Sequence, residues 1–504
     1  MGQPADDVSA TILCCDLGGS SLRVGLINEQ GRIVAQATQT LAVPVSPDGR
    51  SEVDPQVWWH TFQKLVASLA SAGPSLLHKV VGVSICGMTR TQVLVDDDGH
   101  AVRPAITWRD SRAGSEVLDL AAACDGESID VFHPVARLAW VQRHEPEAFA
   151  AARVVIEPKD YLALRLTRRP ASDRISLARL LAVIRSEGPL ARFSSLLPDL
   201  VQPSSMIDRV RSGLPSPLDA LAGCPVFMAS NDTWTAVLGL GALRSGLAYN
   251  IVGTSEVLGL IASQPATAPG LMSVDWGDGL HQIGGPSQNG GDVIPWLVHA
   301  CGGQDHNLAE SLSFLLAGPR HPQPVLFLPF LQGERVPYWD PDLRGAFLGL
   351  AKGHGSTDLA WAVLEGAAFA ARLVLERAEA ATGEAVREIR FGGGGARSEA
   401  WCQVRADAMR RPVAVGAYDE PGLLGCAAVA WTGLGRFASL TEAQQMIAPP
   451  VRQFEPQIDR AEHYDALYAV YTDAVSATAP IAHRLAAMRI ADGLATVAAP
   501  QDER

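Results

Sequence analysis

Lysine is scarce in this chain, and the phosphate-binding loops that depend on it are absent. Only four of the 504 residues are lysines (Lys64, Lys79, Lys159 and Lys352), and the other basic residues are arginines. No lysine follows a glycine, so no G-x-x-x-x-G-K-[ST] loop is present. The glycines at 392–395 miss the G-x-G-x-x-G phase, because Arg397 stands where the last glycine would be. Both common nucleotide-binding folds are therefore disfavoured.

Long apolar runs, paired cysteines and a basic leader are also missing. No segment has the roughly 18 consecutive apolar residues of a membrane helix, and the first ten residues carry acids where a secretory signal carries basic residues. The eight cysteines form no C-x-x-C pair and no metal-ligand spacing, which favours buried, reduced thiols. We therefore expect a cytoplasmic protein without a membrane partner.

Positive charge is nowhere clustered. The formal net charge is −13, the pI is about 5.4, and the sequence has no basic run. A nucleic-acid backbone is bound by a clustered positive stripe, so nucleic acid is not expected as a partner. The length of 504 residues exceeds the roughly 250–300 residues at which one core stops growing, so two domains are expected.

The hydrophobic pattern places similar openings in the two halves of the chain. Residues 11–37 alternate short apolar runs with turns and predict a β-meander, after which strands and helices alternate. Residues 247–262 repeat the strand–turn–strand pattern in the second half. The repeat predicts two related α/β domains, 1–244 and 245–504, with the boundary after a glycine-rich helical segment at 233–243.

The turn after the first strand has the residues of a phosphate and metal site. Asp16 ends the apolar run, and two glycines and two serines follow at 18–21. Glycines let the backbone approach an anion, amides and hydroxyls donate to phosphate oxygens, and a carboxylate can hold the bridging cation. Such a turn by itself is more often a plain hairpin. The second turn, 253–255, shifts the balance towards two loops that hold a polyphosphate between the domains.

Two strand-to-helix junctions add a nucleotide loop and a candidate base. The run at 391–398 places glycines between a strand and a helix N-terminus, where a nucleotide can dock closely. Asp232 follows the apolar strand at 225–228 and opens a helix of small residues. It is predicted to cap this helix, to act as the general base that accepts a hydroxyl proton in phosphoryl transfer, or to do both.

Two longer motifs resemble the signatures of the FGGY carbohydrate kinases. Residues 345–350 read GAFLGL and are followed at 358–365 by DLAWAVLE, which resembles the C-terminal signature of the family. Residues 132–144 resemble its earlier signature, with Arg137 where lysine is usual. The resemblance runs from Asp16 to about Trp431. It implies two related domains of the actin-like, ribonuclease H-like ATPase fold that flank a deep catalytic cleft.

The resemblance also assigns roles to single residues. Asp16 matches the carboxylate that holds the metal, and Asp232 matches the catalytic aspartate. The positions that match ATP-binding residues are Gly18, Gly19, Ser20, Ser21, Arg23, Gly253, Thr254, Ser255, Gly291, Gly394, Gly395 and Ser398. Those that match acceptor-binding residues are Met88, Thr89, Trp108, Asp110, Asn231 and Asp232. ATP and Mg²⁺ are the implied cofactors and a small sugar or polyol is the implied partner, whereas a homodimer stays open.

The acceptor side departs from the pattern of the relatives. Met88 aligns with the methionine of a Gln-Met-His stretch in xylulose and gluconate kinases, but Gly87 and Thr89 replace the other two residues, and Arg109 stands where xylulose kinases usually have asparagine. We predict a ketopentose such as xylulose, with gluconate, erythritol or glycerol as alternatives. A sugar-independent ATPase of the same fold would lack the strip from Trp108 to Arg112, and a silent regulator would have lost a key aspartate.

Overall fold

The structure is a computed structural model that describes residues 10–73, 75–121, 129–253, 255–302 and 308–488. The chain divides into two compact units. Unit 1 comprises Met1–Leu243 and Glu420–Pro449, and unit 2 comprises Arg244–Asp419 and Pro450–Arg504. This division differs from the second domain predicted over 245–504, because residues 420–449 return to unit 1.

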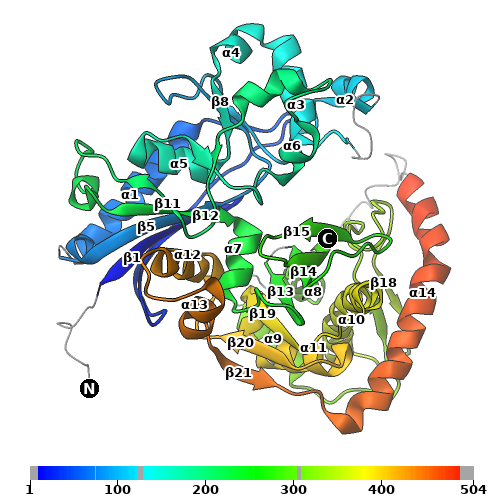
Figure 1. Ribbon diagram of the computed structural model, residues 1–504. Coiled ribbons are helices and arrows are strands. Elements are labelled where there is room, and N and C mark those ends of the chain that lie inside the picture. Colours follow the sequence, from blue (N-terminus) through cyan, green and yellow to red (C-terminus); the bar gives the residue numbers. More distant parts are fainter. Residues whose placement is uncertain (1–9, 74, 122–128, 254, 303–307, 489–504) are drawn as a thin grey trace, which may run out of the picture. The chain divides into compact units, whose positions relative to one another are not determined.

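The returning segment belongs to unit 1 because its helix is apolar and closely packed there. Helix α12 (Pro421–Gly433) packs on α7 (Asp232–Gly239) and on β1 (Thr11–Leu17), as Figure 1 shows. A Cβ atom on Gly425 would lie 1.9 Å from the carbonyl oxygen of Thr235, so this close approach of α12 to α7 requires glycine. The next helix, α13 (Leu440–Ile447), carries Gln444, which binds the backbone N–H and C=O of Leu243.

Unit 1 is built on a six-stranded sheet with the order β11-β12-β5-β1-β2-β3. Strands β1, β5 (Val80–Gly87) and β12 (Pro225–Asn231) are parallel, and β2 (Ser21–Asn28), β3 (Ile33–Thr40) and β11 (Met206–Arg209) are antiparallel to their neighbours. The predicted meander is confirmed as β1-β2-β3. The parallel strands are almost continuously apolar because helices cover them, among them α5 (Pro158–Thr167) and α12. Helix α1 (Pro55–Ala72) packs on β2 and β3.

The rest of unit 1 forms a second apolar cluster around α3 (Pro134–His144), and short strands connect the two cores. The remaining helices are α2 (Gly114–Ala121), α4 (Pro146–Ala151) and α6 (Ala178–Val183). The short strands are β4 (Glu52–Val53), β6 (Val93–Val95), β7 (Ala105–Ile106), β8 (Val154–Ile156), β9 (Ala171–Ser172) and β10 (Asp199–Leu200).

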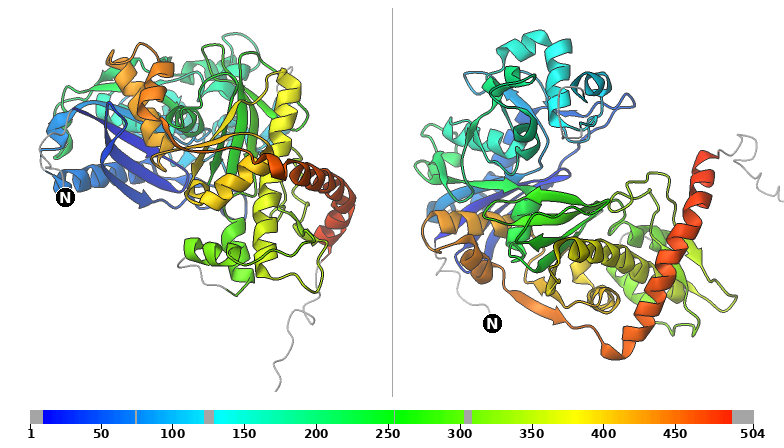
Figure 2. Two further views of the ribbon diagram at one scale, coloured as in Figure 1. Left: turned by 90° about the horizontal axis from the view of Figure 1, so that it is seen from below. Right: turned by 45° about the vertical axis from the view of Figure 1, so that its right-hand side comes forward.

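Unit 2 contains a seven-stranded sheet with the order β15-β16-β14-β13-β19-β20-β21. Its strands are β13 (Leu247–Val252), β14 (Glu256–Ala262), β15 (Met272–Asp275), β16 (His281–Ser287), β19 (Glu388–Gly393), β20 (Val413–Gly416) and β21 (Pro450–Phe454), with a separate pair, β17 (Leu326–Leu328) and β18 (Ala346–Leu348). The helices are α8 (Val293–Ala300), α9 (Leu308–Leu316), α10 (Ser356–Thr382), α11 (Glu399–Met409) and the long α14 (Ala461–Ala487), which Figure 2 shows along one side of this unit.

The two sheets share an opening arrangement. In unit 1 the antiparallel pair β1-β2 lies beside the parallel strand β5, and in unit 2 the antiparallel pair β13-β14 lies beside the parallel strand β19. The repeat in the sequence therefore corresponds to two related α/β units, each with a mixed sheet and covering helices.

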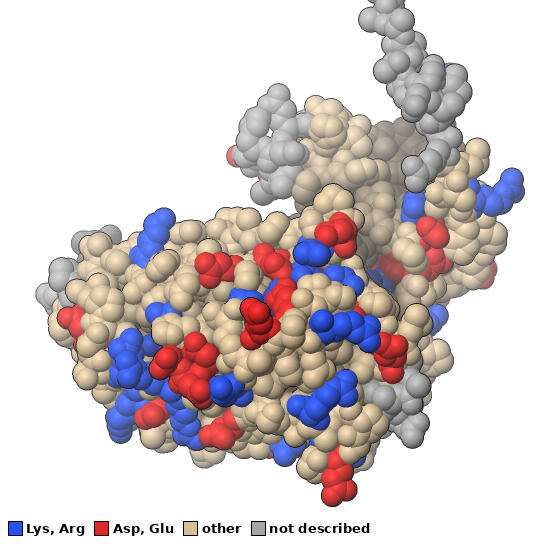
Figure 3. All heavy atoms as spheres, turned by 90° about the horizontal axis from the view of Figure 1, so that it is seen from above, with Lys and Arg blue, Asp and Glu red and all other residues tan. Residues whose placement is uncertain are grey.

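The surface and the cysteines follow the expectations from composition. Figure 3 shows acidic and basic side chains interspersed over the face drawn. Among the described residues, no helix combines the length and the apolar character needed to cross a membrane. Cys14, Cys15, Cys86, Cys402 and Cys426 are free and buried, and Cys224 and Cys301 are free and partly buried, whereas Cys124 lies outside the described residues.

Candidate active site

The parallel strands of unit 1 bring the predicted metal and base residues to one edge of the sheet. Asp16 of β1 pairs in register with Cys86 of β5, and Gly87 of β5 pairs with Asn231 of β12. Asp232 follows Asn231 directly and begins α7. Ligands of open α/β sheets bind at the carboxyl ends of the parallel strands, so this edge is the candidate site.

Asp232 is the first residue of α7, and its neighbour caps the helix. The side-chain oxygen of Asn231 accepts a hydrogen bond from the N–H of Trp234 at 2.9 Å, so the N-cap is Asn231 and the prediction that Asp232 caps the helix is wrong. Thr233 donates its N–H and its hydroxyl to Oδ1 of Asp232, at 2.7 and 3.2 Å. Within the described part of the chain Oδ2 has no hydrogen-bond partner, which leaves it able to accept a proton.

Burial tunes the protonation of Asp232. It raises the pKa of the carboxyl above its ordinary value, while the Thr233 hydrogen bonds and the charge of Arg90 oppose the shift. A carboxylate of raised pKa is a stronger base than an ordinary surface aspartate. Because Oδ1 is held by Thr233 and Oδ2 is unengaged, the geometry suits proton abstraction from a hydroxyl.

Asp16 lies close to several groups without a tight ion pair. Its Oδ2 is 3.6 Å from Nη1 of Arg23, and the thiol of Cys86 is 3.6 Å from Oδ1. Gly422, near the start of α12, approaches so closely that a Cβ atom there would lie 2.5 Å from Oδ2. Burial and the charge of Asp232 raise the pKa of Asp16 to about 6, although Arg23 lowers it.

This environment fits a divalent cation held mainly by water and phosphate. Mg²⁺ is usually bound through one or two carboxylates, several waters and substrate phosphates. The like charges of Asp16 and Asp232, which raise the pKa of Asp16, are what such a cation would offset. The described residues contain no group of three or more His, Cys, Asp or Glu side chains arranged to hold a metal. Asp16 therefore fits as a single protein ligand.

The predicted first phosphate loop, 18–21, is a tight turn that Trp108 of the predicted acceptor strip, 108–112, approaches. Gly18 donates its N–H to the carbonyl of Ser21 at 3.0 Å, and Ser20 is exposed whereas Ser21 is 7% exposed. The indole Nε1 of Trp108 lies 3.5 Å from the position of a Cβ atom on Gly19, which is an ordinary van der Waals contact. Arg23 follows on β2 and pairs with Glu420 at 3.1 Å as well as facing Asp16.

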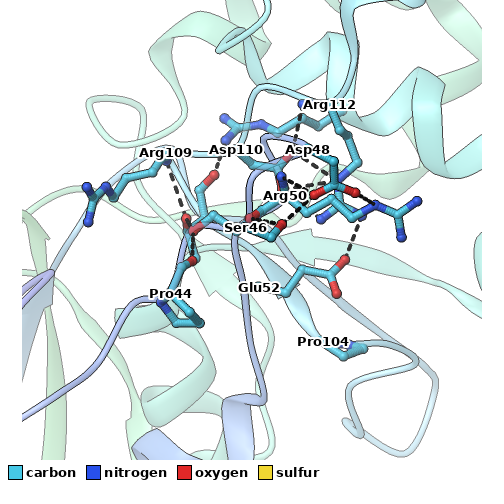
Figure 4. A network of polar contacts seen from close by, with 12 residues as sticks. Pro44, Ser46, Asp48, Arg50, Glu52, Pro104, Arg109, Asp110 and Arg112 are labelled. Atoms are coloured by element: carbon cyan, nitrogen blue, oxygen red, sulfur yellow. Dashed lines mark hydrogen bonds and ion pairs between the residues drawn. The ribbon is translucent and has the colours of Figure 1, made fainter. Parts of the chain in front are cut away.

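The predicted acceptor-binding residues differ in their burial and in the hydrogen bonds that their polar groups already form within the protein. Met88 is buried, Trp108 is 40% exposed, and the hydroxyl of Thr89 donates to the carbonyl of Ser176 at 3.2 Å. Asp110 is fully buried and accepts hydrogen bonds from Arg112 on both oxygens, at 2.9 and 2.7 Å, and from the N–H of Ser51 at 2.6 Å. Figure 4 shows this network, in which Arg112 also pairs with Glu52. In this arrangement Asp110 anchors the strip.

The predicted second phosphate loop, in unit 2, brings three predicted residues together. Gly253 donates its N–H to the carbonyl of Ser255 at 2.9 Å, and Gly291 donates to the carbonyl of Gly253 at 2.8 Å. A Cβ atom on Gly291 would lie 2.5 Å from that carbonyl oxygen, so glycine is required. Thr254 lies outside the described residues. Asp292, which had no predicted role, accepts the N–H of Gly290 and the side chain of Gln332 and so holds the turn.

The predicted adenosine loop separates into exposed and packed residues. Gly394 begins a short 3-10 turn and has open space where a Cβ atom would be, whereas Gly395 is buried against Phe391 and Trp401. The hydroxyl of Ser398 accepts the N–H of Trp401 at 3.3 Å and caps α11. Gly394 therefore faces solvent, while Gly395 and Ser398 shape the junction.

A buried charged network close to the start of α7 was not predicted. The ammonium of Lys159 lies 2.5 Å from Oδ1 of Asp160 and 2.9 Å from Oδ2 of Asp173, with all three side chains almost fully buried. Asp173 also accepts the hydroxyl of Ser230, next to Asn231, at 2.7 Å. The rarity of lysine in the sequence was the available signal, because a lone lysine in an apolar segment needs buried partners.

Comparisons with known proteins agree with this arrangement. The N-terminal domain model of the FGGY family of carbohydrate kinases matches residues 11–239, and the C-terminal domain model matches residues 248–434. A xylulose kinase of Klebsiella pneumoniae is 32% identical over 433 residues, which cover 78% of this chain and 83% of that protein. A gluconokinase of Bacillus subtilis is 24% identical over 92% of this chain and 95% of its own length.

A solved structure shows the same fold. The xylulose kinase from Rhodospirillum rubrum superposes with a TM-score of 0.80 and 26% identity, covering 94% of this chain and all of that chain. The two domain models together match most of the sequence, and the matched fold extends over almost all of it. The chain therefore belongs to the FGGY family of carbohydrate kinases.

Proposed function

We propose that this sugar kinase transfers the γ-phosphoryl group of ATP to a hydroxyl of a small open-chain sugar, with Asp232 as the general base. The observation that carries the proposal is the state of the Asp232 carboxylate, whose Oδ1 is held by Thr233 and whose Oδ2 has no hydrogen-bond partner in the described structure. It begins a helix at the carboxyl edge of the sheet, where a ligand is expected.

The reaction places few covalent demands on the protein. The acceptor oxygen forms a bond to the γ-phosphorus, the bond from that phosphorus to the β–γ bridging oxygen breaks, and the hydroxyl proton passes to Asp232 as ADP leaves. When bound, Mg²⁺ supplies charge neutralisation of the phosphate oxygens. Asp16 is proposed as its ligand, and the amides and hydroxyls at 18–21, with Arg23, are proposed to position the phosphates.

Unit 2 is proposed to contribute to nucleotide binding through its glycine turns. Gly253, Ser255 and Gly291 form one hydrogen-bonded turn, and Gly394 has open space beside its backbone. Thr254 keeps its proposed role from the sequence alone. Backbone amides in such turns bind anions without a lysine, which suits a chain with four lysines.

Two acceptor classes have support. The Klebsiella protein is a xylulose kinase and supports a ketopentose such as xylulose. The Bacillus protein is a gluconokinase, and the positive charge of Arg90, which acts on Asp232, gives a specific reason to consider sugar acids in this chain. Gluconate is therefore tested as a sugar acid, and erythritol and glycerol are tested as the neutral alternatives.

A coupled ADP-release assay tests the proposal. Purified protein with ATP and Mg²⁺ is screened against ketopentoses, aldonates, tetritols and glycerol, and ADP release is expected to depend on one of these acceptors. Acceptor-independent release at the full rate would contradict the proposal and favour a sugar-independent ATPase.

Replacing Asp16 by asparagine is expected to separate metal use from stability. Asp16→Asn removes the proposed ligand, so the Mg²⁺ concentration for half-maximal activity should rise at least about tenfold. The folded pKa of about 6 exceeds the ordinary 3.8, so the charge of Asp16 costs stability increasingly as pH rises between these values. At pH 7.5 the free energy of unfolding of the variant, measured with urea, should exceed that of the wild type by on the order of 1–3 kcal/mol. At pH 4 the two free energies of unfolding should be equal. An unchanged Mg²⁺ requirement would refute the metal role.

Glu334 is expected to support ATP binding by fixing the turn before Gly291. Its carboxylate accepts the hydroxyl of Ser287 at 3.0 Å and the N–H of Gln288 at 2.6 Å. Glu334→Gln replaces an acceptor by a donor, so the KM for ATP should rise about tenfold or more while the KM for the acceptor stays constant. The exposed Glu455→Gln serves as the control. Equal changes in both KM values would speak against this role.

A further inference from the structure

Arg90 has an unusual backbone conformation that the surrounding structure enforces. Its φ angle of 57° lies in the left-handed region, which a residue with a side chain rarely adopts. Glu157 holds this conformation, because its Oε1 accepts the N–H of Arg90 at 3.0 Å and its Oε2 accepts the N–H of Thr91 at 3.4 Å. Conformations of this kind persist where neighbours over-determine them, and they are concentrated at binding and catalytic sites.

The backbone places Arg90 on the side of the sheet edge where Asp232 lies. Gly87, three residues before Arg90, pairs with Asn231, one residue before Asp232. Thr89, which precedes Arg90, donates its hydroxyl to the carbonyl of Ser176. The hydroxyl of Ser176 lies 3.5 Å from the hydroxyl of Ser230 on β12. The charge of Arg90 acts on Asp232 and lowers the pKa of its carboxyl against the larger effect of burial.

The guanidinium of Arg90 lacks a partner in the described part of the chain. Its nitrogens form no hydrogen bond, and no carboxylate there lies within 4.0 Å of them. Burial and the charge of Arg179 lower the pKa of Arg90, whereas the more distant charges of Asp130, Glu157 and Asp232 raise it. Neighbouring arginines are engaged. Arg137 donates to the carbonyls of Thr107 and Phe132, and Arg179 faces Asp130 at 3.8 Å. A partly desolvated cation without a partner is costly, so an unmet anion is expected beside it.

Arginines and carboxylates are both close to Arg90, with Arg179 on one side of the balance and Asp130, Glu157 and Asp232 on the other. Arg90, Arg137 and Arg179 all act on His133, and together with burial they lower its pKa to about 3, which keeps the imidazole neutral. Burial and the charge of Asp160 raise the pKa of the Glu157 carboxyl, whereas Lys159 and the N–H groups of Thr91 and Arg90 lower it. Both oxygens of Glu157 are already engaged by these N–H groups, so this carboxyl does not bind the guanidinium of Arg90. The guanidinium of Arg90 therefore keeps its hydrogen-bond donors available to a negatively charged group.

We propose that the guanidinium of Arg90 binds a carboxylate of the acceptor, so that the substrate is an open-chain sugar acid whose hydroxyl is presented to Asp232. This inference rests on the proposed kinase function and narrows its acceptor class. A planar guanidinium binds a carboxylate through two parallel hydrogen bonds, which fixes both the position and the direction of the bound molecule. The neutral ketopentose supported by the Klebsiella relative offers no such partner.

A rival role for Arg90 makes a different prediction. If Arg90 only supplied a counter-charge to Asp232, its loss would change the turnover of every acceptor alike and shift the acid limb of the pH profile. If Arg90 binds the acceptor carboxylate, its loss should raise KM for acidic acceptors and leave neutral acceptors of the same chain length unaffected. Matched pairs of acceptors separate the two roles.

The experiment compares xylonate with xylitol and xylulose, gluconate with glucitol, and erythronate with erythritol, in the ADP-release assay. In the wild type, at least one acid should exceed its neutral counterparts in kcat/KM. Arg90→Met should lower kcat/KM for that acid roughly 10- to 150-fold, mainly through KM, and Arg90→Lys should restore part of the loss. Arg153→Met, which removes an exposed arginine of the same unit, is the control and should leave all constants unchanged.

The outcomes distinguish this inference from the proposed function. Phosphorylation of neutral acceptors but of none of the acids would overturn the sugar-acid inference and leave the kinase proposal standing. An equal loss for both members of a pair in Arg90→Met would overturn it in favour of the counter-charge role. Absence of acceptor-dependent ADP release with every compound would overturn both. The wild-type comparison needs no variant, so the inference stays open to refutation if Arg90→Met fails to fold.

Discussion

Asp232→Asn is expected to slow acceptor phosphorylation by about 10²- to 10⁴-fold, which is the usual contribution of a positioned general base. Asparagine keeps the size of the side chain, and its oxygen can still accept the N–H and hydroxyl of Thr233 at the positions now bonded to Oδ1. The group in the place of Oδ2 becomes an amide that cannot take up a proton. Folding should be preserved and the loss should fall on kcat.

The measurement is single-turnover phosphorylation with saturating ATP, Mg²⁺ and the best acceptor from the screen. Asp219→Asn, an exposed aspartate of the same unit, is the matched control and should retain full activity. Because the pKa of Asp232 is raised above its ordinary value, wild-type activity should decline on the acid side as this carboxyl is protonated. A kcat for Asp232→Asn within a few fold of the wild type would remove Asp232 as the base.

The sequence allowed the positions of Asp16 and Asp232 to be predicted because Asp16 ends the apolar run of β1 and Asp232 directly follows β12. Parallel strands end at the same edge of a sheet, so two such residues from separate strands are brought together once the fold class is known. The meander at 11–37 and the repeat at 247–262 could also be predicted, because the local alternation of apolar runs and turns determines them. These features depend on neighbours in sequence.

Features that depend on distant residues were not predicted. Helix α12 belongs to unit 1 because it packs on α7, and the sequence of residues 420–433 alone does not indicate that it packs there. Asp110 and Asn231 match acceptor positions by pattern, yet their oxygens accept from Ser51, Arg112 and Trp234 within the protein. Arg90 has no sequence signal for its left-handed backbone, because Glu157, which enforces it, lies far along the chain.

The buried lysine is a second position where one substitution should have a large effect, here on stability. Lys159→Met is expected to destabilise the protein by about 3–5 kcal/mol, the usual cost of leaving buried charges without a partner. Burial alone would lower the pKa of Lys159, but Asp160 and Asp173 raise it above its ordinary value. Lys159 in turn helps to lower the pKa of Asp173 against burial, together with hydrogen bonds from Ser176.

The sign of the pH dependence follows from these carboxylates. Without Lys159, burial raises the pKa of Asp173 in the folded state above its unfolded value, so the penalty is small below that unfolded value and grows as pH rises. Urea unfolding at pH 4.5 and pH 7.5 should therefore show the larger loss at pH 7.5. The exposed Lys64→Met is the control and should change stability little at either pH.

The same network predicts how the loss can be recovered. Lys159→Met combined with Asp160→Asn and Asp173→Asn removes all three charges of this network, and much of the stability at pH 7.5 should return. Activity should not return to the same extent, because Asp173 accepts the hydroxyl of Ser230 beside the start of α7, and an amide there no longer provides a charged acceptor. A single Lys159→Met variant as stable as the wild type at pH 7.5 would show that the three charges are not mutually dependent.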